Sequence, residues 1–284
     1  MSATGSRNLV VLRAGDRSLH GQWIAGSPRD FDLFISYYGS EPDRYRADTP
    51  LWEARKGPKW PCIGELLEAN PALVEAYDTF WFPDDDLAAD TDTINRMFAL
   101  FRGFALALAQ PALTPQSYRA HPMLLQRPNH VLRHTGFVEV MAPIFDRPAL
   151  QACLPSFGRS RSGWGLDWVW PRLVGQQRHQ AIAILDATPV WHTRPLGGEL
   201  YRNHPDMDPH RDVERLILEY DLTPEEMASQ YTWDACCAQV KPAWPERIVQ
   251  ELRRLNRIRR MKRRILRIRR AAAAAAATGP KPAG

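Results

Sequence analysis

The stretch YDTFWFPDDDL, residues 77–87, places three aspartates directly after a run of large apolar side chains. The run Phe80–Phe82 is typical of a buried strand. Like charges crowded at the edge of a core need either solvent or a cation beside them. Two interpretations of Asp84–Asp86 therefore stay open: a solvated turn that starts a helix, or a binding site for a hard cation.

Strand-like and helix-like segments alternate on both sides of this stretch. Apolar runs that predict strands lie at residues 8–16, 30–39, 78–83, 136–145 and 181–192. Spacing that predicts helices lies at residues 18–26, 60–77, 91–109 and 147–157, with Asp90 or Thr91 as a cap of the third. This alternation predicts an α/β fold with a mostly parallel sheet flanked by helices. Ligands of such sheets bind beyond the carboxyl ends of the strands, and the three aspartates follow such an end.

Helical signals replace strand signals after about residue 200. The chain is thus expected to divide into a body at 1–200, a helical extension packed on it at 201–245, and a basic amphipathic helix with a disordered tail at 246–284. The apolar stripe of the last helix repeats every three or four positions and consists of Ile248, Leu252, Leu255, Ile258, Met261, Ile265 and Ile268.

The net positive charge of the protein is confined to its last segment. Residues 251–284 hold twelve of the 37 Lys and Arg residues and one of the 32 Asp and Glu residues, so the preceding part is mildly acidic. The tail has three interpretations: a solvated helix, a helix lying on an anionic membrane surface through residues 246–270, or a nucleic-acid contact. Nucleic acid is disfavoured because no aromatic residue stands between the arginines.

The remaining bulk features favour a cytoplasmic protein, with peripheral attachment to the inner face of the membrane as an option. The four cysteines have no disulfide-framework spacing, and the first residues lack the apolar segment of a signal peptide. The most apolar helical stretch, Met97–Ala109, contains Arg102 and is too short to span a bilayer.

Two further motifs carry residues of chemical interest. In SGWGLDW, residues 162–168, Asp167 stands between bulky apolar residues, where desolvation would raise its basicity; a tight turn that packs a tryptophan is the alternative. His192 follows the last predicted strand, at the edge expected for the aspartates. It is either a structural histidine or a third metal ligand.

The motifs together resemble a known family more specifically than any one of them does. The segments NLVVLRAGDRSLH, FDLFISYYG, KGPKW, YDTFWFPDDDL, TGFVEVMAPIF, SGWGLDW and PVWHTRPLGG resemble the domain-of-unknown-function 707 family, which is glycosyltransferase-A-like. The resemblance spans residues 8–201 and excludes the basic tail. It implies a glycosyltransferase-A-like nucleotide-sugar domain at 1–200.

The resemblance also implies a role for individual positions. Asp84 and Asp86 match its Asp-x-Asp metal motif, His192 a late metal ligand, and Asp167 the base that deprotonates an acceptor. The nucleotide would contact Arg13, Ser18, Tyr38, Lys59 and Asp85. The sugars would contact Thr135, Gly136, Glu139, Trp164 and Gly165. One acidic residue stands where better-known galactosyltransferases have a pair, so the stereochemical outcome stays open.

The sequence therefore predicts a metal-dependent glycosyltransferase that uses Mn or Mg as its divalent cation. It would move a sugar from a nucleoside-diphosphate sugar to a hydroxyl acceptor, either a glycan or a lipid-linked molecule. Two alternatives remain: a metal-dependent hydrolase of nucleotide sugars, and a catalytically inactive module that binds them. A kinase or nucleotide switch is disfavoured because the sequence has no G-x-x-x-x-G-K loop.

Overall fold

A long mixed sheet forms the centre of the protein. The computed structural model describes residues 8–26, 28–175, 181–197, 207–228, 233–236 and 244–277. Its strands run in the spatial order β10-β7-β9-β6-β8-β4-β1-β2-β3, and β5 pairs with β9. They are β1 (Asn8–Ala14), β2 (Asp32–Tyr37), β3 (Leu51–Ala54), β4 (Thr79–Trp81), β5 (Leu87–Ala88), β6 (Leu108–Leu113), β7 (Leu132–Thr135), β8 (Ile144–Asp146), β9 (Ile182–His192) and β10 (Trp233–Cys236).

The parallel part of the sheet is built from the N-terminal strands. β1 pairs in parallel with β2 and β4, and β2 pairs in parallel with β3. β8 then joins β4 to β6 with antiparallel pairing on both sides, and β9 lies parallel to β6. The carboxyl ends of β1, β2 and β4 consequently meet at one edge of the sheet, as the sequence predicts.

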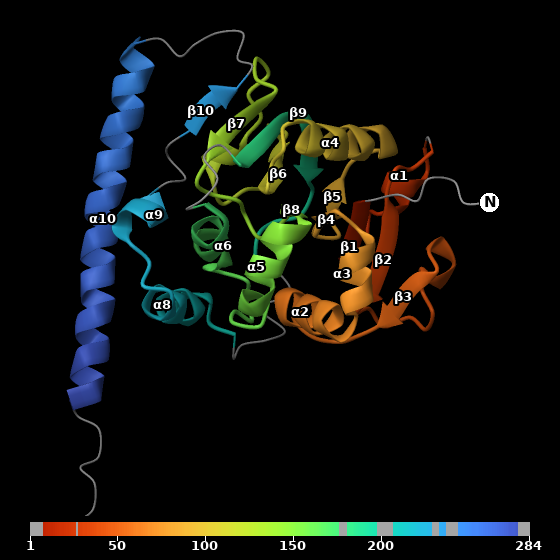
Figure 1. The fold of residues 1–284 in the computed structure, drawn as a ribbon, viewed down its shortest axis with the longest axis horizontal. Coiled ribbons are helices and arrows are strands. Elements are labelled where there is room, and N and C mark those ends of the chain that lie inside the picture. The colour runs from red at the N-terminus through yellow and green to blue at the C-terminus, as the bar shows by residue number, and fades with distance from the viewer. Residues whose placement is uncertain are drawn as a thin grey trace, which may run out of the picture.

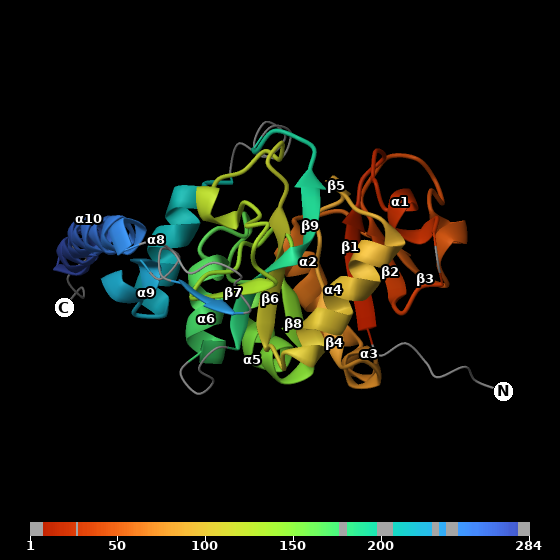
Figure 2. The ribbon, with the colours of Figure 1, turned by 90° about the horizontal axis from the view of Figure 1, so that it is seen from above.

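Helices cover both faces of the sheet (Figure 1). α4 lies on one face and α2 and α5 lie on the other, so the α/β class with flanking helices is confirmed (Figure 2). The helices are α1 (Gly21–Ile24), α2 (Lys59–Ala69), α3 (Pro71–Ala76), α4 (Thr91–Gly103), α5 (Arg147–Phe157), α6 (Leu166–Gly175), α8 (Pro209–Glu219), α9 (Pro224–Ala228) and α10 (Trp244–Ala277), with 3₁₀ turns at Arg46–Asp48 and Pro122–Leu124.

Aspartate side chains cap the starts of α4, α5 and α8. The Asp90 carboxylate accepts a hydrogen bond from the backbone N–H of Thr93 at 2.7 Å, so Asp90 is the cap of α4. Asp146 does the same for Ala149 at the start of α5, also at 2.7 Å. These caps satisfy N–H groups that have no partner inside the helix.

Two predicted elements are wrong. The helix expected over 91–109 ends at Gly103; Ala105 follows with a φ of 50°, and β6 begins at Leu108. An apolar run of this length fits a buried helix and a buried strand equally well by its periodicity. The strand expected over 136–145 is confined to its end, because β8 begins at Ile144 and the preceding residues form a loop.

Short strands at the sheet margins were missed. β3, β5 and β10 have two to four residues each, which is too short for a clear alternation of apolar and polar residues. β10 pairs antiparallel with β7, so the region after residue 200 contributes to the sheet as well as helices. The predicted boundary at residue 200 and the end of the tail, residues 278–284, lie outside the described residues, and the division into domains stays a prediction.

An aromatic cluster fixes the helices that carry the site. Trp60 of α2 packs edge-on against Trp170 of α6 with ring centroids 4.6 Å apart, and against Phe157 of α5 at 4.8 Å. Phe145 of β8 contacts Trp170 at 5.2 Å and so joins the cluster to the sheet. Truncation of one such buried ring to alanine costs on the order of 3–5 kcal/mol of folding free energy. The starts of α2 and α6 are thereby held at fixed positions.

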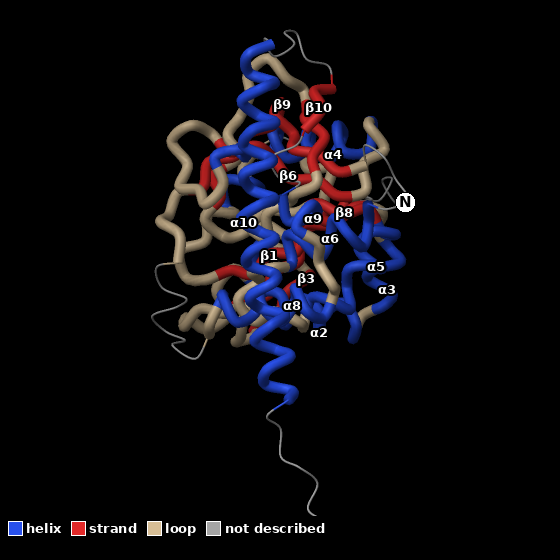
Figure 3. The backbone as a smooth tube through the Cα atoms, turned by 90° about the vertical axis from the view of Figure 1, so that its left-hand side faces the viewer, coloured by secondary structure: helices blue, strands red, loops and turns tan. Residues whose placement is uncertain are grey.

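The long helix α10 lies across α8 and α9 at one end of the molecule (Figures 1 and 3). Its residues Met261, Ile265 and Ile268 are buried there, whereas Leu252 and Leu255 are exposed. The apolar stripe predicted from the sequence is therefore used for packing only along its C-terminal half. No helix in the described ranges offers an apolar segment long enough to cross a bilayer.

Candidate functional site

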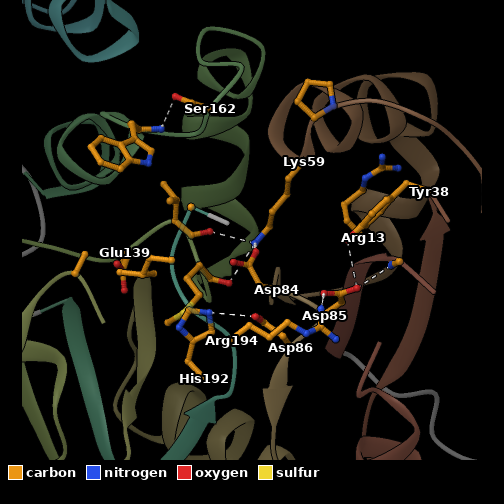
Figure 4. A pocket seen from close by; sticks show the side chains of 18 of the residues that line it. Arg13, Tyr38, Lys59, Asp84, Asp85, Asp86, Glu139, Ser162, His192 and Arg194 are labelled. Atoms are coloured by element: carbon orange, nitrogen blue, oxygen red, sulfur yellow. Dashed lines mark hydrogen bonds and ion pairs between the residues drawn. The ribbon is translucent and has the colours of Figure 1, made fainter. Parts of the chain in front are cut away.

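A cleft of about 1130 Å³ opens at the carboxyl ends of β1, β2 and β4 and at the end of β9. Figure 4 shows its central part: the three aspartates lie between Glu139 on one side and Arg13 and Tyr38 on the other. The predicted residues that line it are Arg13, Tyr38, Lys59, Asp84, Asp85, Asp86, Glu139, Trp164, Gly165, Asp167 and His192.

The first aspartate is paired with a lysine from the start of α2. Lys59 Nζ lies 2.6 Å from Asp84 Oδ1 and also donates to the backbone carbonyl of Phe82 at 2.8 Å. The carbonyls of Val140 and Met141 accept from the same ammonium at 3.1 Å. Burial lowers the pKa of Lys59, and the charge of Asp84 opposes this shift. The ammonium thus already contacts four oxygen atoms of the protein. The contact of Lys59 with a phosphate stays a prediction.

The second aspartate points to the opposite side of the segment. Asp85 Oδ2 accepts a hydrogen bond from the backbone N–H of Gly15 at 2.7 Å and lies 3.4 Å from the Tyr38 hydroxyl. Its other oxygen, Oδ1, is 3.2 Å from Arg194 Nη1. Burial raises the pKa of Asp85, while the Gly15 N–H and the Arg194 charge lower it. Asp85 therefore joins the ends of β1, β2 and β9.

The third aspartate pairs with the histidine at the end of β9. His192 Nε2 lies 3.3 Å from Asp86 Oδ2, and its Nδ1 lies 2.8 Å from the carbonyl oxygen of Tyr118. Burial lowers the pKa of His192, but the hydrogen bond and charge of Asp86 outweigh it and raise the pKa to about 9. The structure places His192 beside the acidic turn, where the sequence predicts it.

These contacts explain how three like charges are tolerated side by side. Each aspartate has its own cationic partner, namely Lys59, Arg194 or His192. The alternation of side chains along the extended segment sends Asp84 and Asp86 to one side and Asp85 to the other. A solvated turn would leave the carboxylates in water, but Asp85 and Asp86 are each only 7% exposed.

A divalent cation would find donors at Asp86 and, once it displaces the proton, at His192 Nε2. The Nδ1 atom of His192 faces a carbonyl, an arrangement typical of a histidine that offers Nε2 to a metal. Asp84 offers only one oxygen beyond the one that Lys59 occupies. Among the described residues, no group of three or more His, Cys, Asp or Glu side chains is arranged to hold a metal. The residues fit a cation held by one or two carboxylates and completed by substrate phosphates and water.

Asp167 lies at the start of α6 on another wall of the cleft. It is 7% exposed, and its Oδ1 has no hydrogen-bond partner among the described residues. Burial raises the pKa of Asp167 to about 7, although backbone N–H groups of Gly165 and Trp168 lower it. A carboxylate with a pKa near neutrality and a free oxygen can accept a proton from a substrate hydroxyl.

Glu139, from the loop before β8, is a second buried carboxyl in the same cleft. It is also 7% exposed, and its Oε2 has no hydrogen-bond partner within the described part of the chain. Burial, and next the charge of Asp167, raise the pKa of Glu139 to about 8. Its backbone N–H donates to the Gln110 side chain, which fixes the loop to β6.

The Gly-Trp-Gly turn before α6 is shaped by packing against its neighbours. Gly163 has a φ of 81°, and a Cβ there would lie 2.7 Å from Trp60 Cδ1. Gly165 has a φ of 93°, and its Cβ would lie 2.8 Å from Leu216 Cδ1. Both positions thus require glycine for the fold. Trp164 between them is 42% exposed and lines the cleft.

The predicted nucleotide residues are divided between the cleft and its surroundings. Arg13 is buried; it donates to Ser36 Oγ at 2.6 Å and to the Gly57 carbonyl at 2.9 Å, and its guanidinium lies 5.5 Å from the Tyr38 ring centroid. Ser18 is bound to His20 Nδ1 at 2.8 Å and is not among the cleft-lining residues. Thr135 and Gly136 do not line the cleft either.

Several polar residues of the cleft were missed from the sequence. The lining includes Asp16, Arg17, Lys56, His121, Ser162 and Arg194. Arg194 has the clearest place, because it contacts Asp85 and donates to the backbone carbonyl of Arg17. Its position two residues after His192 was a usable signal, since both leave the same strand end.

Comparisons with known proteins concern the family and the fold. The family described as "Protein of unknown function (DUF707)" matches residues 129–217, which confirms the resemblance over that segment. No curated protein matches the chain.

Among solved structures, GalNAc-T7 with UDP, GalNAc and Mn²⁺ is similar to this chain with a TM-score of 0.51 and 10% identity, covering 77% of this chain and 49% of that one. TarS from S. aureus has a TM-score of 0.44 at 10% identity, covering 75% of this chain and 42% of its own. A mycobacterial protein has a TM-score of 0.47 at 15% identity, covering 76% and 74%.

The chain therefore spans less than half the length of TarS and of GalNAc-T7. At these identities a likeness concerns the fold alone. The fold is glycosyltransferase-A-like.

Proposed function

We propose that this protein is a glycosyltransferase that moves a sugar from a nucleoside-diphosphate sugar to a hydroxyl acceptor. The observation that carries the proposal is the content of one cleft. It combines the paired aspartates Asp84–Asp86 with a separate buried carboxyl, Asp167, that has a free oxygen and a pKa of about 7.

The diphosphate would bind at the aspartate end of the cleft. Arg17, Lys56 and Arg194 line this end and supply positive charge for phosphate oxygens. The GalNAc-T7 structure contains UDP and Mn²⁺, which supports a nucleoside diphosphate and a divalent cation as ligands of this fold. Asp86 and His192, with the second oxygen of Asp84, would hold the cation. When bound, such a cation neutralises charge on the departing diphosphate.

The chain's own residues then account for the transfer step. The acceptor oxygen forms a bond to the anomeric carbon while the bond from that carbon to the diphosphate breaks, and its electron pair leaves with the diphosphate. The hydroxyl proton passes to Asp167 Oδ1. The N–H groups at the start of α6 hold the Asp167 carboxyl in place, and the aromatic cluster that packs against α6 fixes the position of the helix.

Calorimetry with UDP, GDP, CDP and ADP, each with and without Mn²⁺, tests the proposal. We expect at least one of them to bind more tightly with Mn²⁺, and Asp86→Ala to abolish that gain. Asp92→Ala, an exposed aspartate in the first turn of α4, is the matched control and should bind as the wild type does. Wild-type affinity of Asp86→Ala with Mn²⁺ would contradict the proposal.

Product analysis separates transfer from hydrolysis. A transferase that is given a nucleotide sugar consumes it faster when an acceptor is present, whereas a hydrolase releases the free sugar at the same rate without one. An inactive binding module would bind the nucleotide sugar and neither transfer nor hydrolyse it. Release of free sugar that no acceptor accelerates would favour the hydrolase.

We further propose that α10 attaches the protein to an anionic membrane surface, from the cytoplasmic side. The exposed apolar residues Ile248, Leu252 and Leu255 stand in a helix whose exposed side also carries many arginines. Flotation with phosphatidylserine vesicles tests this with Leu252→Ser/Leu255→Ser, which leaves the packed residues of α10 intact. Equal flotation of the wild type and the double variant would contradict the membrane proposal.

A further inference from the structure

Two carboxyl groups that line the cleft each have one oxygen without a hydrogen-bond partner in the described part of the chain. Glu139 Oε2 and Asp167 Oδ1 are both buried and have no hydrogen-bond partner among the described residues, and both residues line the same cavity. The side chains come from different elements: Glu139 from the loop between β7 and β8, Asp167 from the first turn of α6. Only Asp167 has a role in the transfer step described above.

Unpaired carboxyl oxygens at this depth are costly. A buried polar atom without a partner loses its hydration and gains no hydrogen bond in return. The aspartates Asp84–Asp86 show the usual solution, since each of them has a cationic partner. The two unpaired oxygens are therefore positions where a bound molecule would supply the missing hydrogen bonds.

The charges around Glu139 favour different protonation of the two groups. Asp167 and Asp84 disfavour a charge on Glu139, whereas His192 and Lys59 favour one. The result places the pKa of Glu139 at about 8 and that of Asp167 at about 7. Because a charge on Asp167 raises the pKa of Glu139, the form with Asp167 ionised and Glu139 protonated is favoured when the two carboxyls share one proton. Asp167 then accepts hydrogen bonds, and Glu139 can donate one.

We propose that Glu139 donates a hydrogen bond from its acid form to a second hydroxyl of the acceptor, so that the acceptor is a sugar or polyol with two neighbouring hydroxyl groups. The first hydroxyl gives its proton to Asp167 as it attacks. The second accepts from Glu139, which keeps its proton throughout the step. This inference rests on the proposed glycosyl transfer and narrows its acceptor.

The arrangement orients the nucleophile. A hydroxyl held only by Asp167 can rotate about that one hydrogen bond, whereas two contacts on neighbouring hydroxyls fix the sugar ring relative to the donor. Correct orientation of this kind lowers the barrier of the bond-forming step. An acceptor with a single hydroxyl, such as a simple alcohol, would leave Glu139 unpaired.

Two variants of Glu139 separate hydrogen bonding from charge. Glu139→Gln keeps a donor of nearly the same shape, and Glu139→Ala removes it. Glu68→Gln, at an exposed position of α2, is the control for loss of one carboxyl. Saturation-transfer NMR on the full chain with UDP and Mn²⁺ measures the binding of methyl β-D-glucopyranoside, methyl β-D-galactopyranoside and their monodeoxy derivatives at pH 7.5.

We expect at least one glycoside to bind, and removal of one particular hydroxyl to weaken it about tenfold, the usual effect of one hydrogen bond of about 1.4 kcal/mol. Glu139→Ala should bind the intact glycoside as weakly as wild type binds that deoxy compound, and Glu139→Gln should stay within about threefold of wild type. Equal losses for Glu139→Gln and Glu139→Ala would overturn the proposal, as would binding of no glycoside by any form.

The same experiment distinguishes this inference from the proposed function. Glycoside binding that depends on Glu139, without turnover of any nucleotide sugar, would support the two-hydroxyl site and contradict transfer. Turnover that depends on Asp167 but is unchanged in Glu139→Ala would support transfer and overturn the role of Glu139.

Discussion

Lys59 Nζ lies 2.6 Å from Asp84 Oδ1, and this contact joins the start of α2 to the end of β4. The two residues are 25 positions apart in sequence. The ammonium lies within hydrogen-bond distance of three backbone carbonyls as well, so it holds together the end of β4 and the loop that carries Glu139. The Lys59 side chain therefore supplies a positive charge at the acidic end of the cleft.

Lys59→Met should destabilise the protein. Removal of the ammonium leaves Asp84 and three carbonyls without their donor. Because Asp84 is 40% exposed, solvent offsets part of the loss, and we expect about 1–3 kcal/mol from urea unfolding. Asp84→Asn in the same background should add less than it does alone, whereas additive effects would show that the pair is not coupled. Lys262→Met, at an exposed lysine whose ion pair with Glu225 is also exposed, should change stability by less than about 0.5 kcal/mol.

Asp167→Asn should reduce kcat/KM about 10²–10⁴-fold, which is the range for loss of a general base. Nucleoside-diphosphate affinity should be retained, because Asp167 is not part of the aspartate cluster. In the wild type, the rate should rise with pH through about 7, as Asp167 loses its proton. Initial rates across pH 5.5–9 check both points, with Asp92→Asn as the control. An unchanged rate in Asp167→Asn would exclude it as the base.

Glu139→Gln should stabilise the protein increasingly as pH rises. The folded state keeps the Glu139 proton up to about pH 8, whereas the unfolded chain releases it near its ordinary pKa of 4.5. The unfolded state thus binds fewer protons between these values, so the wild type loses stability there, by up to about 1.4 kcal/mol per pH unit. Glutamine does not titrate and escapes this loss. Thermal unfolding from pH 4 to 9 should show a growing gap; a gap independent of pH would contradict the prediction.

Arg133→Met should destabilise the protein far more than a surface change. Arg133 Nε donates to Asp186 Oδ2 at 2.7 Å and Nη2 donates to Oδ1 at 3.0 Å, and both side chains are fully buried. Removal of one member of such a pair leaves a buried charge and costs about 3–5 kcal/mol. Arg133→Met/Asp186→Leu should recover part of the loss in denaturant unfolding. A loss below 1 kcal/mol in the single variant would be inconsistent with this pairing.

Gly163→Ala should destabilise the turn that leads to Asp167. Its φ of 81° disfavours an L side chain, and the added Cβ would lie 2.7 Å from the buried Trp60 ring. We expect a loss of at least about 1 kcal/mol and reduced turnover, because Trp60 supports α6. Gly103→Ala is the control, since nothing lies within 4 Å of a Cβ there. Equal stability of the two variants would contradict the account of this turn.

Local patterns were sufficient for much of the architecture. The buried strands before the aspartates, the cap at Asp90 and the long basic helix all follow from neighbouring residues, and the structure contains each of them. Errors occurred where local patterns are ambiguous. The run from Met97 to Ala109 fits a helix or a strand, and the turn at Ala105 decides between them only in the folded chain.

The position of His192 next to the acidic turn was the part of the site that could best be predicted from the sequence. His192 and the aspartates both follow strand ends, and ends of parallel strands meet at one sheet edge. Arg194 leaves the same strand end as His192, so its approach to the aspartates could have been expected as well. The pairing of Lys59 with Asp84 was not accessible in this way, because Lys59 enters from a helix start and no strand-end rule relates it to its carboxylate.

By itself the sequence determined the alternation of elements, the placement of acidic residues after a buried strand, and the confinement of positive charge to the last helix. These depend on burial and periodicity, which are properties of neighbouring residues. Only the tertiary structure decided that each aspartate has its own cation and that Glu139 lies near Asp167 with one oxygen unpaired within the described residues. Such pairings depend on how distant segments pack in three dimensions, and packing leaves no signal in the spacing of residues along the chain.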